Sequence, residues 1–188
     1  MIYIYVFTRI ITFFGTQLRV FWEHFMCRLM GIPAEDIRAF KMSELCGHVE
    51  HELCATKKQA FFMCWFPFTA NLILACMLLL TGSYRIFYIG GYNSYVSYIF
   101  LWLGISCAAN CVPSFEDVLT FKDLFYAKDA NKLHKVLFAP FFGVIYVCAL
   151  LERYSLTIVL SIIFAVIFPH LFNLLFPLIS NMLELFAK

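Results

Sequence analysis

Long stretches without a single charged side chain constrain this sequence more than any other feature. Residues 59–82, 86–115, 136–151 and 154–183 contain no Asp, Glu, Lys or Arg. Of the 188 residues, 63% are hydrophobic and 14% are charged, whereas soluble domains carry about 25% charged residues. A soluble core cannot bury this much apolar surface, and the sequence therefore indicates an integral membrane protein rather than a soluble enzyme.

The uncharged stretches predict individual transmembrane helices, because one membrane span needs about 20 mostly apolar residues. We expect spans over 59–82, 92–112, 136–151 and 154–183, with Gly90 and Gly91 in a turn before the second of these. Pro169 and Pro177 are expected to kink or break the last one. Residues 1–26 predict a further, retained span that turns a polar face into the bundle, since Arg9, Arg19 and Glu23 interrupt it.

The basic residues predict how these spans are oriented. They gather in the segments 27–58 and 113–135, whereas the turns near Arg85 and Glu152 carry few. By the positive-inside rule both basic segments are cytoplasmic or interfacial, which places the N-terminus outside. We therefore expect one all-α domain, 1–188, a polytopic transmembrane bundle of about five spans in the cell membrane. The net charge of +2 is too small for nucleic-acid binding, so the bilayer and membrane proteins are the expected partners.

The first predicted span contains ionisable residues that need an explanation. Arg19 and Glu23 are four residues apart, so they share one helix face and can form an ion pair. His24 follows directly. The two interpretations are a structural ion pair near the inner interface and a polar site directed at another part of the bundle.

A second polar group, residues 46–54, combines histidine, cysteine and carboxylate side chains at short spacing. Such residues can bind zinc or another transition metal. His48 and His51 would share a face of a helix but would diverge on a strand. The paired spacings of closed zinc sites are absent, and an ordinary solvated charged loop is the alternative interpretation.

The third polar group, Asn110–Asp117, follows the predicted span 92–112. Pro113 is expected to end that helix, and Ser114 is expected to cap the next one. Acidic residues at the start of the next helix, including Asp117, would favour its dipole. These rules do not explain Asn110, which lies one turn inside the apolar segment.

Four segments carry a likeness to a known family: Cys27–Pro33 (Cys-Arg-Leu-Met-Gly-Ile-Pro), Gly47–Glu52 (Gly-His-Val-Glu-His-Glu), Pro67–Leu72 (Pro-Phe-Thr-Ala-Asn-Leu) and Asn110–Asp117 (Asn-Cys-Val-Pro-Ser-Phe-Glu-Asp). In this order, and with Gly15 before them, they resemble a prokaryotic branch of the site-2 protease class of membrane metalloproteases. The resemblance covers residues 14–125 and implies a helical membrane fold built around a zinc site.

The sequence departs from that family at the zinc-binding motif. The positions of His-Glu-x-x-His fall on Arg19 to Glu23, so that Arg19 and Glu23 replace the two histidines and Val20 replaces the catalytic glutamate. In a zinc hydrolase the histidines hold the ion and the glutamate activates water. The resemblance assigns Asp117 to the third ligand position, with Asn110 and Pro113 beside it. We expect Arg19 and Glu23 to neutralise each other and Asp117 to pair with Arg19.

The resemblance thus implies a pseudoprotease, with no catalytic residues and no favoured metal, that binds or assembles with other membrane proteins. A second hypothesis is an active intramembrane zinc metalloprotease with relocated ligands. Its candidate ligands are His24, His48, His51 and Asp117, and its candidate bases are Glu23 and Glu52. A transporter or channel subunit is a third hypothesis, which the scarcity of ionisable groups in the later spans disfavours.

Overall fold

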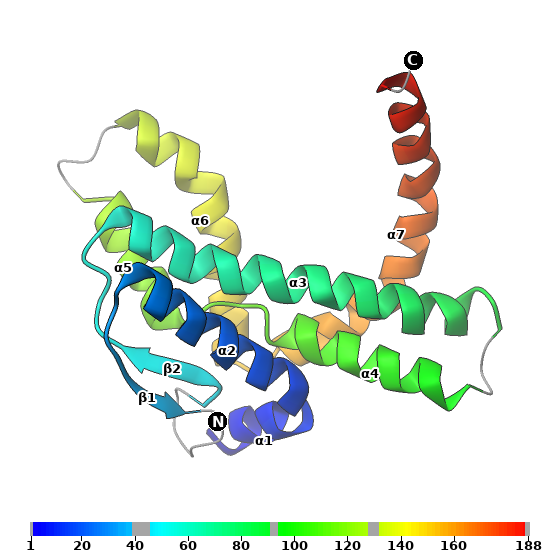
Figure 1. Ribbon diagram of the computed structural model, residues 1–188, viewed down its shortest axis with the longest axis horizontal. Helices are drawn as coiled ribbons and strands as arrows, with labels where there is room; N and C mark the ends of the chain where they lie inside the picture. Colours follow the sequence, from blue (N-terminus) through cyan, green and yellow to red (C-terminus); the bar gives the residue numbers. More distant parts are fainter. Residues whose placement is uncertain (1, 39–45, 91–93, 128–131, 187–188) are drawn as a thin grey trace.

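The computed structural model describes residues 2–38, 46–90, 94–127 and 132–186. Most of this chain is helical, as predicted, and the exception is one short hairpin of strands (Figure 1). The elements follow in the order α1 (Ile2–Ile11), α2 (Phe13–Met30), β1 (Ala34–Arg38), β2 (His48–His51), α3 (Lys57–Phe87), α4 (Tyr95–Ala109), α5 (Phe115–Phe125), α6 (Lys132–Arg153) and α7 (Thr157–Phe186).

Among the described residues, three helices are long and apolar enough to cross a membrane. They are Lys57–Phe87, Lys135–Arg153 and Thr157–Pro177. These helices contain most of the predicted spans 59–82, 136–151 and 154–183. The predicted span 92–112 instead contains α4, which has 15 residues and is shorter than a full span of about 20. Gly90 has a φ of +75°, as a turn glycine would, whereas Gly91 lies outside the described residues.

The helix predicted over 1–26 is present as two helices, because α1 and α2 meet at Thr12, whose backbone is not helical. The hydroxyl of Thr12 donates a hydrogen bond back to the carbonyl of Thr8 at 2.8 Å, a contact that bends helices. Beyond the bend, α2 lies so close to α4 that a Cβ on Gly15 would lie 2.0 Å from the carbonyl oxygen of Ser106. The predicted inward polar face is confirmed, since both arginines and Glu23 are buried.

The hairpin is a small addition to the predicted all-α chain, and it lies within the segment 27–58 that was predicted as a loop. After α2, Gly31 adopts a φ of +67°, and the amide of Ile32 donates to the carbonyl of Cys27 at 2.9 Å. The chain then turns back, and β1 pairs with β2 in antiparallel register, Ala34 with His51 and Arg38 with His48. Because Val49 is buried, β2 packs against the bundle instead of lying in solvent.

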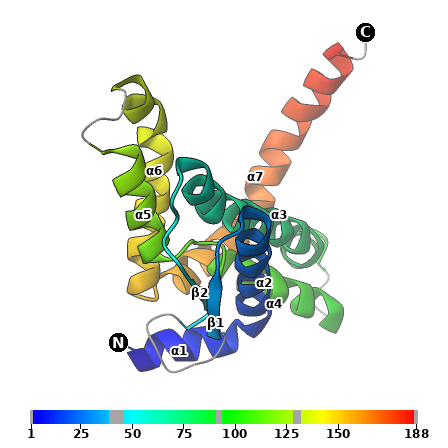
Figure 2. The ribbon, with the colours of Figure 1, turned by 60° about the vertical axis from the view of Figure 1, so that its left-hand side comes forward.

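The remaining helices complete the bundle around α3. The Ser114 hydroxyl accepts a hydrogen bond from the amide of Asp117 at 3.0 Å, which confirms the predicted cap of α5. Helix α6 packs along α5 through aromatic side chains such as Phe121 and Phe142. Helix α7 continues through Pro169 and Pro177, and its C-terminal half projects away from the other helices (Figures 1 and 2).

Candidate functional site

Arg19 and Glu23 lie one turn apart on the face of α2 that points into the bundle. The Arg19 Nε atom donates a hydrogen bond to Glu23 Oε1 at 3.1 Å, which confirms the predicted ion pair. The two residues are only 1% and 2% exposed. A buried ion pair needs further partners, because two groups withdrawn from water keep unused hydrogen-bonding capacity.

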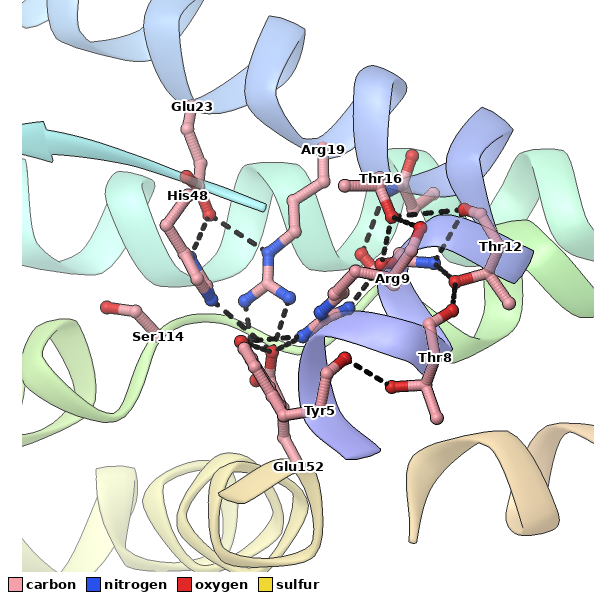
Figure 3. A network of polar contacts seen from close by, with 12 residues as sticks. Tyr5, Thr8, Arg9, Thr12, Thr16, Arg19, Glu23, His48, Ser114 and Glu152 are labelled. Carbon is pink, nitrogen blue, oxygen red and sulfur yellow. Dashed lines mark hydrogen bonds and ion pairs between the residues drawn. The ribbon is translucent and has the colours of Figure 1, made fainter. Parts of the chain in front are cut away.

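Glu152, at the end of α6, supplies the next partner. Arg19 donates to both of its carboxylate oxygens, at 2.6 Å from Nη1 and 3.3 Å from Nη2. Arg9 of α1 forms a second ion pair with the same carboxylate. The consecutive helices α1 and α2 therefore meet the distant helix α6 at one buried carboxylate (Figure 3).

His48 of β2 closes this cluster from the side of the hairpin. Its Nδ1 atom lies 3.0 Å from Glu23 Oε1, and its Nε2 atom lies 3.3 Å from Glu152 Oε1. Burial and the charge of Arg19 lower the pKa of His48 to about 4, so the imidazole is neutral at pH 7. The Val49 amide donates to Glu23 Oε2 at 2.9 Å and fixes the strand beside α2.

We call these five residues, Arg9, Arg19, Glu23, His48 and Glu152, the polar centre. Two guanidinium ions face two carboxylates, and the histidine is neutral at pH 7, so the charges balance. Each charged member touches at least one opposite charge. The arrangement is that of a closed structural network, because its polar groups contact each other rather than an open cleft.

Asn110 ties the polar centre to the α4 end of the bundle. Its side-chain carbonyl accepts from Arg9 and, at 3.0 Å, from the Thr16 hydroxyl, and its amide donates to Thr12 Oγ1 at 2.9 Å. Asn71 of α3 donates to the Asn110 backbone carbonyl at 2.9 Å. These contacts explain why an asparagine lies one turn inside an apolar segment.

Asp117 does not pair with Arg19, and this expectation is wrong. Its Oδ1 atom lies 3.1 Å from His51 Nε2, and its Oδ2 atom accepts from the Ser114 hydroxyl at 2.7 Å. Burial opposes a charge on His51, but the hydrogen bond and charge of Asp117 outweigh it and raise the pKa of His51 to about 9. Glu152 occupies the place beside Arg19 that Asp117 was expected to fill.

Of the residues proposed as relocated zinc ligands, the structure brings His51 and Asp117 together and places His48 and His24 elsewhere. His48 and His51 diverge from β2, as expected on a strand, so that His48 joins the polar centre and His51 joins Asp117. The Nδ1 atom of the half-buried His24 has no hydrogen-bond partner in the described part of the chain, and Glu52 is exposed. Within those described ranges, no three His, Cys, Asp or Glu side chains are grouped as a metal site requires.

The donor set at the position that the resemblance assigns to the zinc motif does not fit a zinc ion. A guanidinium has no lone pair to offer a metal, and Arg19 binds the carboxylate that a metal would need. Both ring nitrogens of His48 already face carboxylate oxygens. Val20 is buried and has no side-chain atom that accepts a proton.

The sequence interpretation missed the roles of Arg9 and Glu152. Glu152 was assigned to a short turn between two spans, whereas it is 4% exposed and contacts Arg9, Arg19 and His48. A count of charges could have indicated a missing acidic partner, because the first apolar segment contains two cations, Arg9 and Arg19, and one anion, Glu23. The carboxylate that directly follows the uncharged stretch 136–151 was the missing partner.

Comparison of the chain with protein-family models, curated proteins and solved structures found no match.

Proposed function

We propose that this chain is a catalytically inactive, site-2-protease-like integral membrane protein that binds or assembles with other membrane proteins. The observation that carries the proposal is the pairing of Arg19 and Glu23 with Glu152 and His48. The residues that stand at the positions of the family's zinc-binding histidines, Arg19 and Glu23, form ion pairs instead. Peptide hydrolysis requires an activated water, and no free base faces such a water in this cluster.

The membrane arrangement that we propose has about five spans with the N-terminus outside. The three long apolar helices support the membrane location. The basic segments 27–58 and 113–135 support the orientation, and the location that follows is a multi-pass protein of the cell membrane.

The binding role is supported by the C-terminal half of α7. Its described side chains are largely apolar and exposed; for example, Leu174 is 74% and Phe176 is 56% exposed. In a membrane such a surface contacts lipid or another helix. We propose that α7 packs against a transmembrane helix of a partner protein.

A photo-crosslinking amino acid at Leu174 tests the binding role in intact membranes. We expect an adduct with a discrete membrane protein, and no such adduct from the matched probe at Phe121, which is fully buried. Adducts with lipid alone at Leu174 would contradict the proposed role.

A cleavage assay with a transmembrane peptide substrate, in reconstituted vesicles, tests the loss of catalysis. The wild type is expected to cleave no faster than a heat-denatured sample. Asp117→Ala should lower thermal stability, because it leaves the His51 imidazolium without its carboxylate. Cleavage by the wild type that is lost in a well-folded Asp117→Ala variant would overturn the proposal and favour the active metalloprotease.

A further inference from the structure

We propose that one end of the bundle, which we call the basic end, binds the headgroups of anionic phospholipids. The basic end comprises Arg28, Lys57, Lys58, Lys122 and Lys135, from the last turn of α2 and from helices α3, α5 and α6. The inference rests on the membrane location in the proposed function and does not depend on the loss of catalysis.

Specific contacts bring these helix ends together. The Gln59 side chain donates to the Met30 carbonyl at 3.1 Å, which joins the start of α3 to the last turn of α2. The Lys57 ammonium lies 6.0 Å from the centre of the Phe125 ring, which joins α3 to α5. The Tyr126 hydroxyl donates to the Lys135 carbonyl at 3.2 Å, which joins α5 to α6. Both ribbon views show these ends on the same side of the molecule (Figures 1 and 2).

The charges of the basic end are accessible to a ligand. Arg28, Lys57, Lys58 and Lys122 are exposed, and Lys135 is half-buried. Within the described ranges, Glu35, Glu52 and Asp123 are exposed carboxylates within seven residues of one of these cations, so they reduce the positive potential in part. The opposite end of the α3–α4 pair is different, because Arg85 is the one charged residue between positions 59 and 115.

The neighbouring apolar side chains favour a lipid over a soluble anion. Val136 and Leu137, which directly follow Lys135, are 74% and 59% exposed. At the interface of a bilayer, the aliphatic part of a lysine side chain lies along apolar surface and its ammonium group reaches the lipid headgroups. A lysine followed by exposed apolar side chains, as at Lys135, fits this position. Basic residues at such a position attract anionic lipids by about 1 kcal/mol each.

Native mass spectrometry of the detergent-solubilised protein, with equal amounts of phosphatidylglycerol and phosphatidylcholine, tests the inference. The wild type is expected to retain phosphatidylglycerol preferentially. The triple variant carries Lys57→Gln, Lys58→Gln and Lys122→Gln together. In it, the preference for phosphatidylglycerol over phosphatidylcholine should fall about fivefold for each removed charge at low salt. Arg85→Gln is the matched control and should leave the preference unchanged, whereas Asp123→Asn should increase it.

An equal preference in the wild type and the triple variant would overturn the inference. The inference would also be overturned if a few millimolar inorganic phosphate displaced the bound phosphatidylglycerol while chloride of the same ionic strength did not. The site would then be one for a soluble anion. Extraction of the chain from native membranes by alkaline carbonate would instead contradict the membrane location itself. The two failures are therefore distinguishable.

Discussion

The polar centre and the contact between α3 and α4 hold the same bundle together by different means. At the polar centre, charged groups from α1, α2 and α6 and the neutral imidazole of His48 from β2 make directional contacts with one another. Between α3 and α4, glycines let two helices touch: a Cβ on Gly82 would lie 2.4 Å from the Leu101 nitrogen, and one on Gly104 would lie 2.7 Å from Leu79 Cγ. The first region should therefore be sensitive to charge, and the second to volume.

Removing the charge of Glu152 should have the largest effect. Glu152→Gln leaves two buried guanidinium ions facing Glu23 alone, and breaking a buried ion pair in this way costs about 3–5 kcal/mol. We expect a large drop in the thermal midpoint in detergent, or loss of the folded peak in size-exclusion chromatography. Glu116→Gln, the same change at an exposed site, is the control. An equal midpoint in the two variants would show that the polar centre does not hold the bundle.

Adding one methyl group between α3 and α4 should have the next largest effect. Gly82→Ala places a Cβ against backbone atoms that cannot rotate away, so the helices must separate, at about 1–3 kcal/mol. Gly143→Ala in α6 is the matched control, because no atom lies within 4 Å of its Cβ. In a helix this control should be neutral or should stabilise by about 0.5–1 kcal/mol. Comparable losses in both variants, measured by thermal unfolding, would contradict the close contact.

The ion pair of His51 with Asp117 should make stability fall at alkaline pH. The folded-state pKa of His51 is raised from 6.5 to about 9, so its contribution is complete below pH 6.5 and is lost as the pH rises through 9. Because water screens part of this pair, we expect a loss of about 1 kcal/mol. Thermal midpoints from pH 6 to pH 10 should decline less in His51→Gln than in the wild type. Parallel curves would rule the ion pair out as a stabilising contact.

His48 should respond in the opposite direction, with an effect of similar size. Its folded-state pKa lies near 4, below the ordinary 6.5, so the unfolded chain takes up a proton first as the pH falls. Stability is then complete above pH 6.5 and declines towards pH 4, by about 1 kcal/mol. His48→Asn should flatten this acid limb relative to the wild type. An acid limb of unchanged slope would mean that the imidazole is not held neutral.

Local features of the fold were predictable from the sequence. The spacing of Arg19 and Glu23 predicted their pairing, and Pro113 with Ser114 predicted a helix end followed by a cap. The apolar stretches predicted the long helices. The ion pair and the cap depend on residues within one or two turns of each other, where helix geometry alone decides which side chains meet, and each long helix depends on one uninterrupted stretch of the chain.

The contacts that the sequence did not reveal are non-local. The carboxylate that pairs with Arg19 lies 133 residues away in the chain, and no spacing rule distinguishes Glu152 from Asp117 as the partner. The hairpin was missed because residues 27–58 lack the alternation of a strand. The bend at Thr12 was missed because it depends on hydroxyl contacts and on the close approach of Gly15 to α4.

Metal content per chain tests the central proposal most directly, namely that ion pairs fill the place that the family resemblance assigns to zinc. The wild type, Asp117→Ala and a His48→Ala, His51→Ala double variant would be purified in detergent without chelator and analysed by inductively coupled plasma mass spectrometry. We predict far less than one zinc per chain, with no difference among the three proteins. Near-stoichiometric zinc in the wild type that disappears in Asp117→Ala would contradict the proposal.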